Sequence, residues 1–274
     1  MIVLCTGCRS GFGLLIATTA ARAGHAVYAG LRDLGAADRL TEAAGDLDVR
    51  PIQLDVTDPA QIEAAVTQIV QEHGRIDALI NNAGVGLGGF WEQLAEDELR
   101  RLFDVNVVGP WALTKACLPH LRASGEGIVI NITSMAGRQA MPGLGAYAGS
   151  KFALEGMTEA LRHEMRPFGV RVVLVEPGPY ATDIFGRNRW MAREAERGTG
   201  PYVAYLRRLE ALVEKLESRM GDAQEVADLT TRLLREPKPK LRYPLGPGVA
   251  ARVWARRVLP FEGVERIMER MLGF

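Results

Sequence analysis

Residues 6–13 read Thr6-Gly7-Cys8-Arg9-Ser10-Gly11-Phe12-Gly13 and join an apolar run to a helical pattern. Glycines permit a tight turn and let a ligand approach the backbone amides. The first turn of a helix also offers free N–H groups and a partial positive charge. The segment therefore predicts a turn that holds phosphate groups of a dinucleotide with all eight residues except Cys8, although an ordinary strand–helix turn is the alternative.

Cys5 and Cys8 form a Cys-x-x-Cys pair inside the same segment. Such pairs occur in thioredoxin-like redox proteins, which makes redox chemistry a second hypothesis for this loop. The glycine between them already has a use in the turn, so two small residues fitted to a tight loop are the simpler interpretation. Cys117 makes the count odd, which does not suggest a disulfide framework and favours a reducing compartment, the cytoplasm.

Short apolar runs alternate with helical patterns on the C-terminal side of this loop. These runs are nearly continuous in apolar residues, which is typical of strands covered on both faces. The alternation predicts an α/β fold, a doubly wound parallel sheet of the Rossmann type with three layers, α/β/α. Strands are expected at residues 2–5, 26–31, 50–56, 76–81, 127–133 and 170–176, and helices at 12–23, 59–73, 96–122 and 147–168.

The pattern changes after Pro177. Helices are expected at 202–220 and 223–235, a strand at 241–245, and further helices broken at Pro260. Because no linker-like stretch interrupts the chain, we expect one domain over 1–274. Within it, residues 184–274 would form a helical substrate cap and the C-terminal part of the same domain.

The apolar residues of this last third recur at helical spacing and have three interpretations. They pack on the body, they form a lid over a hydrophobic substrate, or they contact a membrane surface with help from arginines. Phe185 and Trp190 are the aromatic residues expected to face a substrate. The arginines concerned are Arg252, Arg256 and Arg257.

Composition excludes several classes of function. The 33 basic and 33 acidic residues leave no net charge, which argues against a nucleic-acid partner because phosphates require a basic surface. No apolar run approaches the roughly 20 residues of a membrane span. None of the four histidines falls in a motif, and no Cys/His spacing suggests a metal site.

The end of the second expected strand bears on cofactor choice. An acidic residue there would bind the ribose hydroxyl of NAD, but the sequence has Leu31 followed by Arg32. A guanidinium suits a 2′-phosphate, and Arg9 is a second candidate contact. We therefore expect NADP(H) to be preferred over NAD(H). Two solvated arginines are the alternative, and Asp33 could neutralise Arg32.

Tyr147 and Lys151 share one face at the start of a helix, since they stand at i and i+4. A nearby ammonium lowers the pKa of a phenol from about 10 and makes tyrosine a usable acid/base, although simple packing also explains such a pair. Ser134 follows a strand at the edge where open α/β sheets bind ligands, and its hydroxyl can orient a substrate oxygen. Asn106 lies mid-helix, which indicates a buried water, a bent helix or a capped break.

Together these residues resemble the short-chain dehydrogenase/reductase family, in its single-domain branch, over about residues 1–183. Shorter stretches at 27–34, 104–109 and 150–156 are similar to 17β-hydroxysteroid and retinol dehydrogenases. The matching motifs are the cofactor loop Thr6-Gly7-x-x-x-Gly11-x-Gly13, the adenine-side Leu54-Asp55-Val56, the sheet-steadying Asn81-Asn82-Ala83-Gly84, the tetrad Asn106, Ser134, Tyr147 and Lys151, and the nicotinamide loop Pro177-Gly178-Pro179 with Thr182.

The resemblance implies an enzyme that passes a hydride between NADP(H) and a carbonyl/alcohol pair. It implies Tyr147 as proton donor, Lys151 on the nicotinamide ribose, Ser134 on the substrate oxygen and Asn106 on a proton-relay water. It further implies a homodimer or homotetramer through the helices that hold Asn106 and Tyr147, and a lipophilic substrate of steroid, retinoid or fatty type. The rivals are an NADP(H)-binding regulatory or scaffold protein without turnover, and an isomerase or dehydratase of nucleotide sugars.

Overall fold

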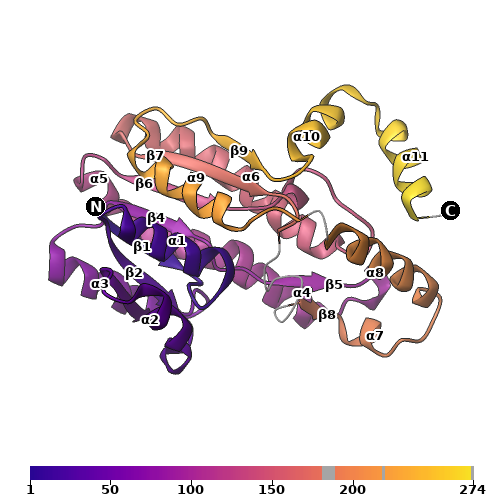
Figure 1. The fold of residues 1–274 in the computed structure, drawn as a ribbon, viewed down its shortest axis with the longest axis horizontal. Coiled ribbons are helices and arrows are strands. Elements are labelled where there is room, and N and C mark those ends of the chain that lie inside the picture. Colours follow the sequence, from indigo (N-terminus) through magenta and orange to yellow (C-terminus); the bar gives the residue numbers. More distant parts are fainter. Residues whose placement is uncertain (181–188, 218–219, 273–274) are drawn as a thin grey trace.

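Seven parallel strands form the central sheet in the order β3-β2-β1-β4-β6-β7-β9. The computed structural model describes residues 1–180, 189–217 and 220–272 (Figure 1). From β1 the chain first builds outward to β3 and then returns to add β4 and the later strands on the other side. The strands are β1 Ile2–Thr6, β2 Ala26–Leu31, β3 Val49–Gln53, β4 Ala78–Asn81, β6 Ile128–Ile132, β7 Arg171–Pro177 and β9 Arg242–Leu245.

Helices cover both faces of the sheet, which confirms the predicted three-layer α/β/α class. One apolar core joins one face to α1, α2 and α9, and a second core joins the other face to α3, α5 and α6. The flanking helices are α1 Gly11–Arg22, α2 Asp38–Ala44, α3 Pro59–His73, α4 Glu96–Phe103, α5 Gly109–Ala123, α6 Gly145–Met165 and α9 Gln224–Arg235.

Local sequence explains the ends of α3. The Asp58 carboxylate accepts hydrogen bonds from the amides of Ala60 (2.9 Å) and Gln61 (3.3 Å), and Pro59 occupies the first helical position. Gly74 then ends the helix with a φ of 70°, a conformation that glycine adopts without strain. The bounds predicted for this helix, residues 59–73, are confirmed.

Residues 189–272 divide between the body and its periphery. Strand β9 is the last strand of the sheet, and α9 packs against α1. Figure 1 shows α8 (Val203–Glu217) below the sheet edge and α10 (Val249–Val258) and α11 (Phe261–Leu272) reaching away from the body. Among the helices of the described ranges, none has both the length and the apolar character to cross a bilayer.

A second, two-stranded parallel sheet was not expected from the sequence. It pairs β5 (Gly86–Gly88) with β8 (Arg189–Met191), and the short helix α7 (Arg193–Glu196) follows. Three-residue strands, one of them Gly-Leu-Gly, carry too little alternation to be detected. The main strand β3 also ends at Gln53, three residues before the expected end.

Candidate active site

The glycine loop is a tight turn between β1 and α1. Gly7 and Gly11 have φ values of 71° and 57°, which other residues rarely adopt. The amides of Gly7 and Cys8 both donate to the carbonyl of Gly30, at 3.0 and 3.1 Å. A Cβ on Gly13 would collide with the carbonyl of Gly7 and the side chain of Asn82. The loop can therefore hold this shape only with glycine at these positions.

Polar contacts lock the loop to the end of β4. Thr6 Oγ1 accepts from the amides of Asn82 (3.0 Å) and Ala83 (2.9 Å), and Asn82 Nδ2 donates to the Thr6 carbonyl at 2.8 Å. Ser10 precedes α1 and makes no side-chain capping hydrogen bond. The amides in the first turn of α1 are therefore left without a side-chain cap, which fits a pyrophosphate.

The three cysteines do not form a reactive centre. Cys5, Cys8 and Cys117 are buried, reduced thiols, and Cys8 Sγ donates to the Cys5 carbonyl at 3.2 Å. The hydrogen bond to Cys8 and burial raise the pKa of the Cys5 thiol well above its usual range. Redox cysteines need a lowered pKa and access to solvent, so the thioredoxin-like hypothesis loses its basis.

The rim of β2 presents an exposed arginine. Arg32 follows the strand, and its carbonyl accepts a hydrogen bond from the side-chain amide of Gln53. The Asp33 carboxylate accepts from the Gly35 amide at 2.9 Å and caps a short 3₁₀ turn. The Oδ1 oxygen of Asp33 is therefore already hydrogen-bonded to a backbone amide. Arg9, in the glycine loop, is exposed as well.

The structure brings Tyr147, Lys151 and Ser134 together. The helix α6 begins at Gly145, so Tyr147 and Lys151 lie in its first two turns, each only 4% exposed. Lys151 Nζ lies 5.8 Å from the centre of the Tyr147 ring and donates to the Ile132 carbonyl at 3.3 Å. Ser134 stands two residues beyond Ile132, and its hydroxyl is close enough to the Tyr147 phenol to lower the pKa of that phenol.

Asn106 belongs to a π-helical turn, Asp104–Val108, between α4 and α5. Its buried side chain accepts from the Val85 amide and donates to the Val85 carbonyl, both at 2.9 Å. It also donates to Ser150 Oγ at 3.0 Å, and Ser150 donates to the Tyr147 carbonyl at 2.7 Å. These hydrogen bonds link the π-helical turn, which is the bend expected at Asn106, to the backbone of Tyr147.

Burial sets the charge states of the pair. It raises the pKa of Tyr147 to about 12, against a lowering effect of the Ser134 hydrogen bond. It lowers the pKa of Lys151 to about 8, against a raising effect of Glu155. At neutral pH Tyr147 therefore carries a proton to give, and Lys151 carries a positive charge beside it.

Apolar side chains surround Tyr147 on its other side. Trp190 and Met191 of β8 border this cluster, and the Trp190 ring lies under the Arg101 guanidinium at 5.1 Å. Thr182 and Phe185 lie outside the described residues. The buried members of the cluster besides Tyr147 are Leu87, Leu102, Ala146, Ala192 and Ala195.

The remaining predicted cofactor residues lie at turns that follow strands. Asp55 Oδ1 accepts from the Thr57 amide (2.9 Å) and hydroxyl (2.7 Å), and Val56 packs against Gly109. Pro177 ends β7, and the Gly178 amide donates to the Leu245 carbonyl at 2.8 Å. The backbone at Gly84 passes beside Asn106 and Lys151, where an added Cβ would lie 3.5 Å from Lys151 Nζ.

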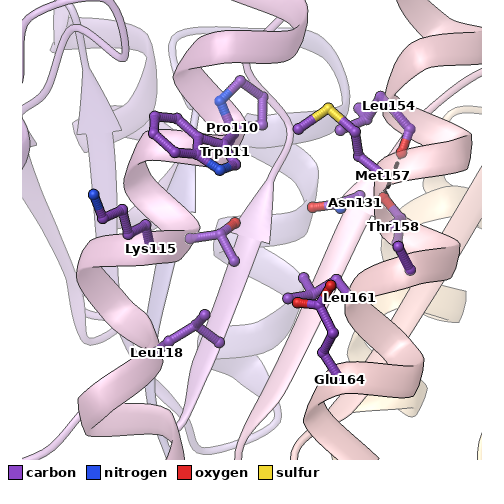
Figure 2. Close-up of a pocket in the computed structure, with 12 residues that line it drawn as sticks. Pro110, Trp111, Lys115, Leu118, Asn131, Leu154, Met157, Thr158, Leu161 and Glu164 are labelled. Atoms are coloured by element: carbon purple, nitrogen blue, oxygen red, sulfur yellow. Dashed lines mark hydrogen bonds between the residues drawn. The ribbon is translucent and has the colours of Figure 1, made fainter.

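A separate cavity of about 300 Å³ lies between α5 and α6 (Figure 2). None of the four tetrad residues lines it. Its lining includes Asn131, which accepts from Asn81 Nδ2 at 2.8 Å and donates to Thr158 Oγ1 at 2.7 Å. Trp111 and Met157 border its opening and are 50% and 40% exposed.

The described residues hold no group of three metal-ligating side chains.

Sequence reasoning missed a group of charged residues beneath the tetrad. Glu155 and Glu176 are almost fully buried, and Arg138 and Arg242 pair with them. The available signal was weak: Glu155 falls one turn after Lys151, and Glu176 ends an apolar strand.

Comparison with known proteins agrees with this geometry. The family model described as short chain dehydrogenase matches residues 1–192. This chain belongs to the short-chain dehydrogenase/reductase family. The resemblance inferred from its motifs is thereby confirmed, and the chain is a member of a family of oxidoreductases that use nicotinamide dinucleotides.

Individual relatives cover most of the chain. The 3-ketodihydrosphingosine reductase of Bacteroides thetaiotaomicron is 36% identical over 246 residues, which are 90% of this chain and 88% of the relative. The 17-beta-hydroxysteroid dehydrogenase type 1 of Homo sapiens is 37% identical over 252 residues, 88% of this chain and 76% of the relative. A short-chain dehydrogenase/reductase from Burkholderia phymatum, solved in complex with NAD, has 29% identity and a TM-score of 0.81, with 96% and 94% of the two chains covered.

Proposed function

We propose that this protein is an NADP(H)-dependent oxidoreductase that interconverts a carbonyl and an alcohol on a lipophilic substrate. The observation that carries the proposal is the buried Tyr147, whose phenol lies near the Ser134 hydroxyl and beside the Lys151 ammonium. The Tyr147 phenol can therefore give a proton to a bound substrate, and the neighbouring Ser134 hydroxyl can hold the substrate oxygen by hydrogen bonding.

The direction of reduction illustrates the roles. The Ser134 hydroxyl donates to the substrate carbonyl and holds its oxygen against the Tyr147 phenol. The bound cofactor supplies the hydride in reduction and accepts it in oxidation. Tyr147 gives its proton to the substrate oxygen, and the Lys151 charge stabilises the phenolate that is left. Asn106 acts on Tyr147 through Ser150 and keeps its backbone in place.

The chain's own residues suggest how the cofactor is held. The residues Thr6 to Gly13 and the first turn of α1 would take the pyrophosphate, with Asp55 and Val56 on the adenine side. Asn82, Ala83, Gly84, Pro177 and Gly178 would line the nicotinamide half. The exposed guanidinium of Arg32, together with the exposed Arg9 of the glycine loop, supports a preference for the 2′-phosphate of NADP.

A lipophilic substrate is supported by the apolar surroundings of Tyr147. Leu87, Met191 and Leu206 offer no charged group to a substrate on this side of the phenol. The two relatives described above are named for a sphingoid ketone and a steroid, both of them lipophilic.

The test is NADPH consumption with a panel of lipophilic ketones and aldehydes. Tyr147→Phe should abolish turnover of each active substrate, because the phenol proton is lost while the ring remains. Tyr243→Phe is the matched control, since Tyr243 lies on β9 and hydrogen-bonds to the Lys240 amide. Full activity in Tyr147→Phe would refute the proposal. Cofactor binding without turnover across the panel would favour the regulatory or scaffold alternative.

The face of α5 and α6 is the surface we propose for homodimer formation. Trp111 and Met157, which line the cavity of Figure 2, are 50% and 40% exposed, and Phe152 of α6 is 46% exposed. A second copy of this chain would cover them. Light scattering should give a dimer or tetramer for the wild type and a smaller species for Trp111→Glu.

The free thiols fit a cytoplasmic location.

A further inference from the structure

Two carboxylates lie buried beneath the proposed catalytic residues. Glu155 and Glu176 are only 4% and 1% exposed. Buried carboxylates cost free energy unless they are paired and hydrogen-bonded. Arg242 Nε lies 3.1 Å from Glu155 Oε2 and 3.3 Å from Glu176 Oε1. Arg138 Nη1 lies 3.2 Å from Glu176 Oε1.

Both carboxylates hold the backbone that carries Ser134. Thr133, the residue before Ser134, donates from its hydroxyl to Glu155 Oε1 at 2.7 Å. On the other side, Arg138 follows the 3₁₀ turn Met135–Gly137 and is held by Glu176. Each end of the Ser134 segment is therefore anchored to one carboxylate.

Glu155 also acts on the charge of Lys151. The two residues are one turn apart on α6, and both side chains are buried. The carboxylate favours the ammonium form of Lys151 against the opposing effect of burial. Since the ammonium stabilises the Tyr147 phenolate, the position and charge of Glu155 bear directly on proton transfer.

The charges of this cluster do not balance. Glu159 also binds Arg242, at 2.7 Å, so that three carboxylates share two guanidinium groups. Arg242 lowers the pKa of the outer Glu159. His163, one turn further on α6, and Arg138 add smaller lowering effects. Burial, with the Glu155 charge next, raises the pKa of Glu176 to about 7. Near neutral pH the Glu176 carboxyl group therefore still holds its proton in a large share of the molecules.

We propose that Glu155 and Glu176 are positioning residues of this active site, an inference that rests on the proposed oxidoreductase function. They anchor the two ends of the Ser134 segment, and Glu155 places a carboxylate one turn from Lys151 on the same helix. Both residues act through others and do not touch substrate.

The first test is the pH profile of carbonyl reduction in Glu155→Gln, because the Lys151 ammonium stabilises the phenolate that reduction leaves on Tyr147. The amide still accepts from Thr133 but no longer raises the pKa of Lys151. Lys151 should therefore lose its charge at a lower pH, and the midpoint at which the rate falls as pH rises should move down by roughly half to one pH unit.

Glu159→Gln is the matched control for this test. It removes a carboxylate from the same helix and the same arginine, but from a side chain that is 52% exposed. Its midpoint should equal that of the wild type. An unchanged midpoint in Glu155→Gln, or an equal shift in Glu159→Gln, would overturn the role assigned to Glu155.

The second test needs no substrate. A folded-state pKa above that of free glutamate means that the stabilising protonated form of Glu176 is present below pH about 4.5 and is lost as pH rises through about 7. The wild type should therefore lose thermal stability over this range relative to Glu176→Gln, whose amide mimics the protonated acid. The Tm of the variant minus that of the wild type should rise by several degrees from pH about 5 to pH about 8.

The two tests separate the two proposals. A Tm difference that does not change with pH would refute a protonated Glu176 near neutral pH, whatever the enzyme does. Retained turnover in Tyr147→Phe would refute the proposed function and leave the Tm result to decide the carboxylate pair alone.

Discussion

The two sides of Tyr147 are built differently. Towards β1 and β6, polar side chains such as Thr6, Asn82 and Lys151 hydrogen-bond to strand or loop backbone. Towards β5 and β8, the neighbours are apolar side chains on short elements, among them Leu206 of α8. Polar groups that bond to backbone have one allowed position, whereas apolar contacts tolerate repacking.

This contrast suggests a division of labour. The polar side would hold the cofactor and the proton-transfer groups, where a small displacement is costly. The apolar side would select the substrate, where a single contact is worth much less. If the division is right, substitutions on the polar side cost far more activity than substitutions on the apolar side.

The largest effect should come from Lys151→Met, which keeps the length of the side chain and removes the charge. We expect a loss of about 10²- to 10⁴-fold in kcat. Since Lys151 is charged below pH about 8 and neutral above it, the ratio of wild-type to variant rate should be greatest below pH 8 and shrink above it. Lys238→Met, at an exposed position after α9, is the control. A ratio independent of pH would show that the charge of Lys151 does not matter.

A smaller loss is expected for Gly13→Ala. The added methyl collides with the Gly7 carbonyl and Asn82, which must move out of the cofactor loop. Strain of this kind costs roughly 1–3 kcal/mol, so binding of NADPH should weaken by about 10- to 100-fold. Gly156→Ala in α6 meets no atom within 4 Å and should bind NADPH like the wild type. Equal affinity in both variants, measured by fluorescence titration, would mean that the loop does not hold the cofactor.

The polar side was also the more predictable one. The spacing of Gly7, Gly11 and Gly13 and the pair Tyr147/Lys151 depend on local geometry, which the sequence shows directly. The main sheet followed from the alternation of apolar runs and helical patterns. The apolar side depends on β5 and β8, which are about 100 residues apart and too short to show a pattern.

Glu155 and Glu176 escaped prediction for a different reason. A glutamate in a helix or at the end of a strand is expected in solvent. Its burial here depends on Arg242, which is 87 residues from Glu155. Long-range pairing of this type leaves no periodic signal, so only the folded structure reveals it.

The choice of cofactor tests the outer rim of the polar side. Arg32→Ala should weaken NADPH binding by about tenfold and leave NADH binding nearly unchanged, because the exposed guanidinium would contact only the 2′-phosphate. Both dissociation constants can be measured by titration at one fixed salt concentration. Arg39→Ala, on α2, controls for the loss of a positive charge near this rim. Tighter binding of NADH than NADPH by the wild type would contradict the expected preference.

The smallest effect should come from the apolar side. Leu206→Ala removes part of a half-buried side chain that packs against the apolar cluster containing Tyr147, and we expect KM for a lipophilic substrate to rise about fivefold, equivalent to about 1 kcal/mol, with kcat little changed. A contact that Leu206 makes equally with the substrate and with the transition state changes KM but leaves the rate of proton transfer unchanged. If Leu206→Ala lowered kcat as strongly as Lys151→Met, α8 would have to position the reacting groups as well. The two sides of Tyr147 would then act as a single unit, and the division between chemistry and selection would fail.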